Sequence, residues 1–108
     1  MRLFASSDLK QGSSVRFELR PLLEGFAVRA ADGLVRAYVN VCPHRGQPVD
    51  VGDGRLFLPS GDIECPSHGA RFDPSTGACT GGPCGGLGLT RLPIEEREGA
   101  IWLTTGSI

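Results

Sequence analysis

Apolar and polar residues alternate over several short stretches of the chain, a pattern typical of strands. The clearest stretch is residues 15–20, VRFELR, in which every second side chain is apolar. This period of two predicts a strand with one buried face. No window of eleven or more residues keeps a helical stripe of apolar positions, so the pattern predicts a mostly antiparallel β fold.

The segment around Asp32-Gly33 predicts a hairpin. Residues 26–31 and 34–41 flank this dipeptide, which accepts the positive φ angles of a two-residue turn. In the second strand, alternate residues are expected to face the core and the others the opposite side. The expected core-facing residues are Val35, Ala37, Val39 and Val41, and the opposite side carries Arg36 and Asn40.

Two further hairpins are predicted downstream. Residues 56–58 and 63–64 flank a Pro-Ser-Gly-Asp turn signal. Residues 90–97 and 100–104 flank Glu98-Gly99 in the same way. The sequence therefore predicts three hairpins. The strand at residues 34–41 is expected to end at Cys42, and the strand at residues 63–64 at Cys65.

The composition predicts one folded, turn-rich domain over residues 1–108. The chain has 16 Gly and 8 Pro residues, and 40% of its residues are hydrophobic. Six Gly, one Pro and two Cys fall within residues 77–88, which predicts an irregular covering loop over the site. Tyr38 and Trp102 are expected to complete the core, since single aromatic residues in strands usually do so.

Charge and hydropathy exclude several classes of partner. The 11 basic and 12 acidic residues are scattered without long runs, which argues against a nucleic-acid groove and a polybasic membrane anchor. The N-terminus has no apolar run long enough for a signal peptide or a spanning helix, so we expect a cytoplasmic protein. Cysteines stay reduced in that compartment, so the four Cys indicate metal ligands or free thiols before disulfides.

Two short strings carry the candidate chemistry, Cys42-Pro43-His44 and Cys65-Pro66-Ser67-His68. They contain the two histidines of the chain, and each histidine closely follows a cysteine. Thiolate and imidazole together suit zinc or iron. Zinc fingers with two Cys and two His usually pair like with like and place the histidines on a helix. Because each string here mixes one of each, the pattern favours an iron–sulfur centre over a structural zinc site.

Residues 42–46 and 65–73, followed by Thr76-Gly77 and Gly82-Pro83, resemble a Rieske ferredoxin. The resemblance implies a Rieske-like antiparallel β-sandwich in which two hairpin loops bind a cluster and a Gly/Pro loop covers it. The implied segments are cluster-binding loops at about residues 42–48 and 65–73 and a covering loop at about residues 77–88.

The resemblance also implies the cofactor, one [2Fe–2S] cluster of the Rieske type, in which two histidines replace two cysteines on one iron. The implied ligands are Cys42 and Cys65 on the inner iron, and His44 and His68 on the outer iron near the surface. Because these four residues fill the ligand positions, Cys79 and Cys84 are interpreted as free thiols in the covering loop.

Departures from the high-potential members of this family predict a low redox potential. Those members carry a disulfide between the two loops, but the matching positions here are Gln47 and Ser67. They also carry a Ser and a Tyr whose hydroxyls bond to sulfur, and here Ala70 and Phe72 stand in those places. Fewer donors stabilise the reduced state less, which predicts a potential near the low end of the range of about −150 to +300 mV.

These features predict a soluble one-electron carrier. The expected partners are a flavin-dependent ferredoxin reductase and a terminal oxygenase, one that hydroxylates aromatic rings. The chain is not expected to be an enzyme itself, because both histidines are committed and a catalytic iron domain needs many more residues. The alternatives are a small Rieske-type relay subunit of a nitrite reductase-like complex and a zinc-bound interaction module.

Overall fold

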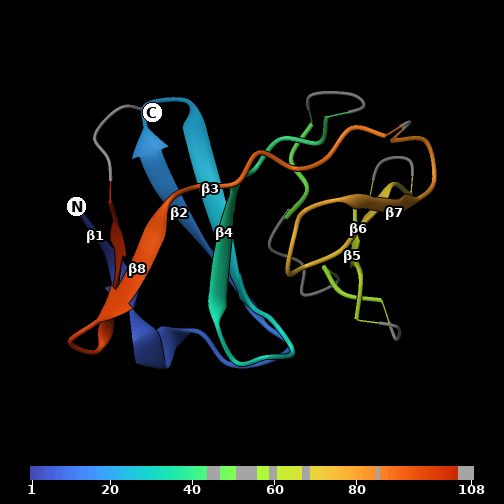
Figure 1. Cartoon of the computed structure of the whole chain (residues 1–108). Helices are drawn as coiled ribbons and strands as arrows, with labels where there is room; N and C mark the ends of the chain where they lie inside the picture. The colour runs from blue at the N-terminus through green and yellow to red at the C-terminus, as the bar shows by residue number, and fades with distance from the viewer. Residues whose placement is uncertain (44–46, 51–55, 59–60, 67–68, 85, 105–108) are drawn as a thin grey trace.

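The computed structural model describes residues 1–43, 47–50, 56–58, 61–66, 69–84 and 86–104 (Figure 1). Strands dominate these residues, and the helical structure among them is one 3-10 turn, η1 (Ser6–Asp8). The fold is mostly antiparallel β, as the periodicity predicts. Within the described part of the chain, no helix is long and apolar enough to cross a membrane.

The described strands form three antiparallel sheets of three strands each. The first sheet has the order β1-β9-β8, with β1 (Arg2–Ala5), β9 (Ala100–Leu103) and β8 (Ile94–Arg97). The second has the order β2-β3-β4, with β2 (Ser14–Arg20), β3 (Leu23–Arg29) and β4 (Val35–Val39). The third, smaller sheet has the order β5-β6-β7, with β5 (Ile63–Glu64), β6 (Arg71–Phe72) and β7 (Cys79–Gly81).

The middle sheet has buried residues on both faces. One face packs against the first sheet through a cluster that includes Ala27, Ala37 and Ile101. The other face packs toward the third sheet, seen to the right in Figure 1, through a second cluster that includes Phe26 and Tyr38. Strands buried on both faces lose the strict alternation of apolar and polar residues, which explains the continuous apolar run in β3.

This double burial corrects the faces predicted for the strand before Cys42. Asn40, expected on the side away from the core, is 5% exposed, whereas Val41, expected in the core, is 38% exposed. The last Cα pairing of β4 with β3 is Gly25 with Val39, so the alternation that the prediction used ends one residue before Asn40. Tyr38 is fully buried, as expected.

Two of the three predicted hairpins form as pairs of strands, β3–β4 and β8–β9, and one of their turns differs from the prediction. Of the hairpin predicted from residues 56–58 and 63–64, the structure shows one isolated bridge, Phe57 with Ile63, and its turn residues 59–60 lie outside the described residues. Gly33 has a φ of 82° and donates its N–H to the carbonyl of Ala30 at 2.9 Å, while the N–H of Ala30 bonds to Leu34 O at 2.9 Å. The loop therefore contains three residues, 31–33, where two were predicted. At the β8–β9 turn, Glu98 and Gly99 both have positive φ, 53° and 73°, as a two-residue turn requires.

Two other predictions for the strands are wrong. β7 lies inside residues 77–88, which were expected to be irregular throughout, because it pairs with β6. Trp102 is only partly buried: its neighbours Ile101 and Leu103 face the core, so the alternation of β9 turns Trp102 outward, where the Arg97 guanidinium lies 4.4 Å from its ring centroid.

Candidate metal centre

The two cysteines of the candidate strings lie close to the ends of strands and deep in the molecule. Cys42 follows β4 by three residues, and Cys65 follows β5 directly. They are 2% and 1% exposed and belong to the same buried cluster, beside the middle sheet. The structure therefore places both thiols that the sequence predicts as ligands in one buried cluster.

Each cysteine lies at the start of a turn, and a backbone hydrogen bond of the same kind closes both turns. The N–H of Cys42 donates to the carbonyl of Gln47 at 2.6 Å, and the N–H of Cys65 donates to that of Ala70 at 2.8 Å. Each bond joins two residues that are five positions apart. We call residues 42–50, which run from Cys42 through this bond to Val49 and Asp50, the first cysteine turn, and residues 65–70 the second. His44 and His68 fall within these turns in the sequence but outside the residues that the structure describes.

Asn40 holds the first cysteine turn, a role that the sequence reasoning missed. Its side-chain amide donates to Asp50 O at 2.9 Å, and its Oδ1 accepts the N–H groups of Val49 and Asp50, both at 2.8 Å. The hydroxyl of Ser14 in β2 donates to Asp50 Oδ2 at 2.6 Å. The sequence did carry a signal for this role, a polar residue two positions before the predicted ligand Cys42. A polar side chain at a buried position must have hydrogen-bond partners.

Tyr38 connects the middle sheet to the turn that follows β6. Its hydroxyl donates to the carbonyl of Pro74 at 2.7 Å. In that turn, Gly77 N–H bonds to Asp73 O at 2.7 Å. Burial raises the pKa of Tyr38 to about 12, so the phenol keeps its proton and remains a hydrogen-bond donor throughout the neutral range.

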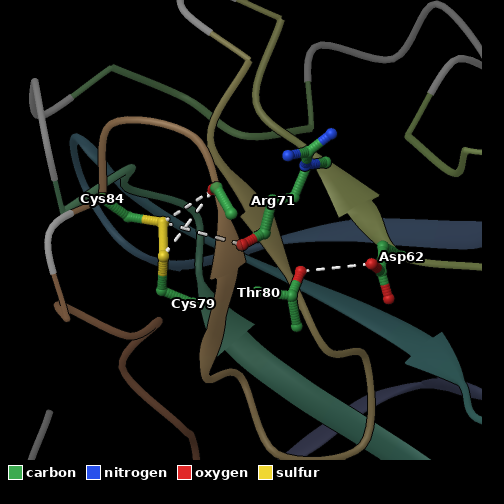
Figure 2. The surroundings of a disulfide bond; sticks show 6 residues. Asp62, Arg71, Cys79, Thr80 and Cys84 are labelled. Carbon is green, nitrogen blue, oxygen red and sulfur yellow. Dashed lines mark hydrogen bonds between the residues drawn. A yellow bond between two sulfur atoms is a disulfide. The ribbon is translucent and has the colours of Figure 1, made fainter.

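Cys79 and Cys84, interpreted from the sequence as free thiols, form a disulfide, which corrects that interpretation (Figure 2). Their Cα atoms are 6.0 Å apart, a separation that a disulfide spans without backbone movement. The pairing of β6 with β7 and a positive φ of 78° at Gly82 bend the chain back to produce this approach. The prediction rested on the redox compartment and on the four ligand positions being already filled, and the sequence pattern carries no information about this geometry.

The disulfide-closed segment lies directly against the second cysteine turn. A Cβ placed on Gly82 would come within 2.5 Å of Gly69 O and 3.0 Å of the Cα of Ala70. Only a residue without a side chain allows this approach of the two backbones. Cys84, at 1% exposure, completes the same buried cluster that contains Cys42 and Cys65.

The described donors fit a thiolate-bound metal. A thiol packs in an apolar core as a small hydrophobic group, but a thiolate there needs a compensating cation, because burying an unpaired charge is costly. The disulfide takes Cys79 and Cys84 and leaves Cys42 and Cys65 as thiols. Among the described residues, no three potential ligands gather at one point; the two predicted histidines lie outside that set.

Comparison with known proteins identifies the sequence pattern. Residues 1–90 match the family model described as the Rieske [2Fe-2S] domain. The chain is 36% identical over 84 residues to the oxygenase component of dicamba O-demethylase from Stenotrophomonas maltophilia, a match that covers 72% of this chain. It covers 23% of that protein, so the chain spans only about a quarter of this curated relative.

Two solved structures are similar over nearly the whole chain. The ferredoxin of carbazole 1,9a-dioxygenase from Nocardioides aromaticivorans IC177 is 32% identical with a TM-score of 0.76, covering 95% of this chain and 94% of that one. A chain in the complex of reduced oxygenase and oxidised ferredoxin in carbazole 1,9a-dioxygenase is 25% identical with a TM-score of 0.79, covering 98% of this chain and 92% of that one.

Proposed function

Because the chain belongs to the Rieske [2Fe-2S] domain family and thus binds a [2Fe–2S] cluster, we propose that it is a one-electron carrier to an oxygenase. When bound, such a cluster takes up and gives back one electron. The observation that carries the proposal is the pair of buried cysteines, each at the base of a matched closed turn. Because members of this family bind a [2Fe–2S] cluster, family membership also argues against the alternative of a zinc-bound interaction module.

The proposed ligands are the four residues of the two strings: Cys42 and Cys65 on one iron, and His44 and His68 on the other. The burial of both thiols supports the assignment of the cysteines to the inner iron. The assignment of the histidines rests on the sequence and on the mixed ligation of Rieske centres. In this arrangement Asn40 orients the first cysteine turn through the three hydrogen bonds described above.

The proposed potential is low. Ala70 and Phe72 are fully buried in the same cluster as Cys42 and Cys65, and neither has a hydroxyl to donate to sulfur. Such donors raise the potential by stabilising the reduced state. A redox titration is expected to give a midpoint below the middle of the range of about −150 to +300 mV for Rieske centres, and a midpoint well above it contradicts this part of the proposal.

The proposed partners are a terminal oxygenase that hydroxylates aromatic rings and a flavin-dependent ferredoxin reductase, in the cytoplasm. The likeness to a ferredoxin of carbazole 1,9a-dioxygenase, and to a chain in a ferredoxin–oxygenase complex, supports the oxygenase side. The reductase is expected because a carrier that delivers single electrons needs a donor of single electrons. In this proposal the chain transfers electrons and leaves the chemistry on the substrate to its partner.

One observation favours a second candidate, the Rieske domain of an oxygenase. The dicamba relative is itself an oxygenase component, and this chain matches 23% of it. The two candidates share the cluster and differ in where the electron goes, to a separate protein or to a catalytic iron on the same polypeptide.

The ligand assignment is tested by low-temperature EPR of the dithionite-reduced protein, with iron and sulfide analysis. We expect two iron and two sulfide per chain and the signal of a mixed His/Cys cluster. Changing His68→Ala or Cys42→Ala should abolish the signal, because it removes one of four ligands. The control is Cys79→Ser/Cys84→Ser under anaerobic conditions, which should keep it. Loss of the signal in this control as well contradicts the ligand set.

The carrier role is tested by mixing the reduced protein with the oxygenase component of a carbazole dioxygenase and following the loss of the reduced-cluster absorbance. We expect oxidation of the carrier with hydroxylated product in proportion to the electrons delivered. A native gene product that contains mononuclear iron and forms product without a separate oxygenase would instead establish the second candidate.

A further inference from the structure

The six residues from Cys79 to Cys84 form a covalently closed ring that takes no part in the proposed cluster ligation. We propose that Cys79 and Cys84 are a reversible thiol–disulfide site whose oxidised form clamps the second cysteine turn and whose reduced form releases it. The reagent that acts on it is a dithiol, small or carried on a protein. Three observations around the ring carry this inference.

The first observation is that both sulfurs already face hydrogen-bond acceptors. Cys84 Sγ lies 3.1 Å from Gly81 O and 3.6 Å from Arg71 O, and Cys79 Sγ lies 3.7 Å from Gly81 O (Figure 2). A disulfide has no S–H group, so these carbonyls gain a hydrogen bond only when the pair is reduced. The surroundings are therefore arranged to accept the dithiol without orphaning its polar groups.

The second observation is the unequal burial of the two cysteines. Cys84 is 1% exposed, whereas Cys79 is only partly buried. An incoming thiolate attacks a disulfide sulfur through a mixed-disulfide intermediate, and the exposure directs this attack to Cys79. The released Cys84 thiolate then takes up a proton, and the resulting thiol donates to the carbonyl of Gly81.

The full exchange balances. The first thiolate of the reagent forms a mixed disulfide with Cys79 and breaks the Cys79–Cys84 bond. The second thiolate of the reagent then attacks the reagent's first sulfur, which is bonded to Cys79. This step releases Cys79 as a thiolate that takes up a proton, and it leaves the reagent as a disulfide. Two electrons and two protons pass in total from the reagent to the pair.

The third observation links the ring to the second cysteine turn. Gly82, inside the ring, packs on the backbone of Gly69 and Ala70, and Ala70 O accepts the N–H of Cys65. The first half of the ring is also held by β7 pairing and by the hydrogen bond from Thr80 Oγ1 to Asp62 Oδ2 at 3.1 Å (Figure 2). Reduction therefore loosens the half that contains Gly82.

The chemical part of the inference is tested by alkylation of the native protein after equilibration with dithiothreitol, with each cysteine followed by peptide mass spectrometry. Labelling of Cys79 and Cys84 is expected to rise together at a defined dithiothreitol poise and to fall again on reoxidation, in protein that stays folded. Labelling that begins only in denaturant overturns the inference. This readout does not require the cluster, so it stands or fails separately from the proposed function.

The structural part, which rests on the proposed ligand set, is tested by the rate at which the oxidised cluster loses iron to a chelator. Reduction of the pair is expected to speed this loss about tenfold, the order expected for opening a small closed loop. The comparison of reduced with oxidised wild type needs no variant. The matched control, Cys79→Ser/Cys84→Ser, should lose iron at the faster rate and ignore dithiothreitol. Equal rates in both wild-type forms overturn the clamp.

Discussion

The two cysteine turns close in the same way but are held by different means. In both, the cysteine N–H bonds to a carbonyl five residues ahead. The first turn is gripped by a single buried side chain, Asn40, which makes three hydrogen bonds to the far end of the segment. The second is held by backbone pairing of β5 with β6 and by the close packing of Gly82. The first cysteine turn thus depends on the side-chain amide of Asn40, and the second depends on Gly82 having no side chain.

This difference predicts that the two turns fail separately. A change at Asn40 should loosen the backbone around Asp50 and spare the N–H of Cys65, and a change at Gly82 should do the reverse. The substitutions predicted below use this contrast and run from the largest expected effect to the smallest.

The largest effect is expected for Asn40→Ala. The change leaves the buried N–H groups of Val49 and Asp50 without their acceptor, so the free energy of unfolding should fall by about 4 kcal/mol. Urea unfolding followed by fluorescence of Trp102, the one tryptophan in the chain, measures the loss. Hydrogen exchange should accelerate at Val49 and Asp50 first, and a loss below 1 kcal/mol would show that Asn40 does not hold the turn.

The second effect is expected for Gly82→Ala. Alanine there adopts a φ of +78° and places its Cβ within 2.5 Å of Gly69 O, which should cost about 3 kcal/mol and expose the N–H of Cys65 to exchange. The matched control is Gly86→Ala, where φ is +86° but no atom lies within 4 Å of the added Cβ. The control should cost only about 1 kcal/mol. Equal costs at both positions would mean that packing on the second turn contributes nothing.

The sequence predicts the elements that depend on neighbouring residues and misses those that depend on distant ones. The period of two in residues 15–20 and the turn signal at Asp32-Gly33 act locally, and β2 and the β3–β4 hairpin appear where they were expected. The buried position of Asn40 depends on a third layer that packs on the far face of the middle sheet. Alternation within one strand carries no information about that layer.

The candidate site divides in the same way. The local pattern predicts the strands that end near Cys42 and Cys65, so the sequence places both residues at strand ends. The disulfide depends on the 6.0 Å separation of two Cα atoms, a distance set by the pairing of β6 with β7. The sequence alone shows that Cys79 and Cys84 are five positions apart, and it does not show that their Cα atoms lie close together in space. The positions of His44 and His68 stay predictions.

The third substitution concerns the hydrogen bond by which Tyr38 links the middle sheet to the turn that follows β6. Tyr38→Phe removes the hydrogen bond to Pro74 O and should lower the free energy of unfolding by about 1.5 kcal/mol. Because both cysteine turns keep their own bonds, the exchange rates at Asp50 and Cys65 should stay within about a factor of three of wild type. A larger change at either would show that the turns are coupled through this side chain.

The same tyrosine gives the stability of the protein a dependence on pH. The folded-state pKa of Tyr38 is raised to about 12, above the usual value of about 10 in the unfolded chain. The unfolded state therefore loses its proton first, so this contribution is complete below about pH 10 and is lost as the pH rises toward 12, by roughly 2 to 3 kcal/mol. Tyr38 is the one tyrosine in the chain, so phenolate absorbance reports it directly. A midpoint near 10 in the folded protein would contradict the burial.

The smallest effect is expected for Ser14→Ala, which tests how far the support of the first turn extends. Ser14 reaches Asp50 from β2 with a 2.6 Å hydrogen bond, but the bond is only partly buried, so its loss should cost about 0.7 kcal/mol. If Asn40 alone holds the turn, combining Ser14→Ala with Asn40→Ala should add nothing beyond the sum of the two. A double-mutant cycle measures this coupling, and an interaction energy above about 0.5 kcal/mol would show that both side chains hold Asp50 as one unit. In that case the first cysteine turn is anchored to the middle sheet at two points, Ser14 in β2 and Asn40 directly after β4. A network of side chains would then hold the first turn, whereas main-chain pairing and packing hold the second.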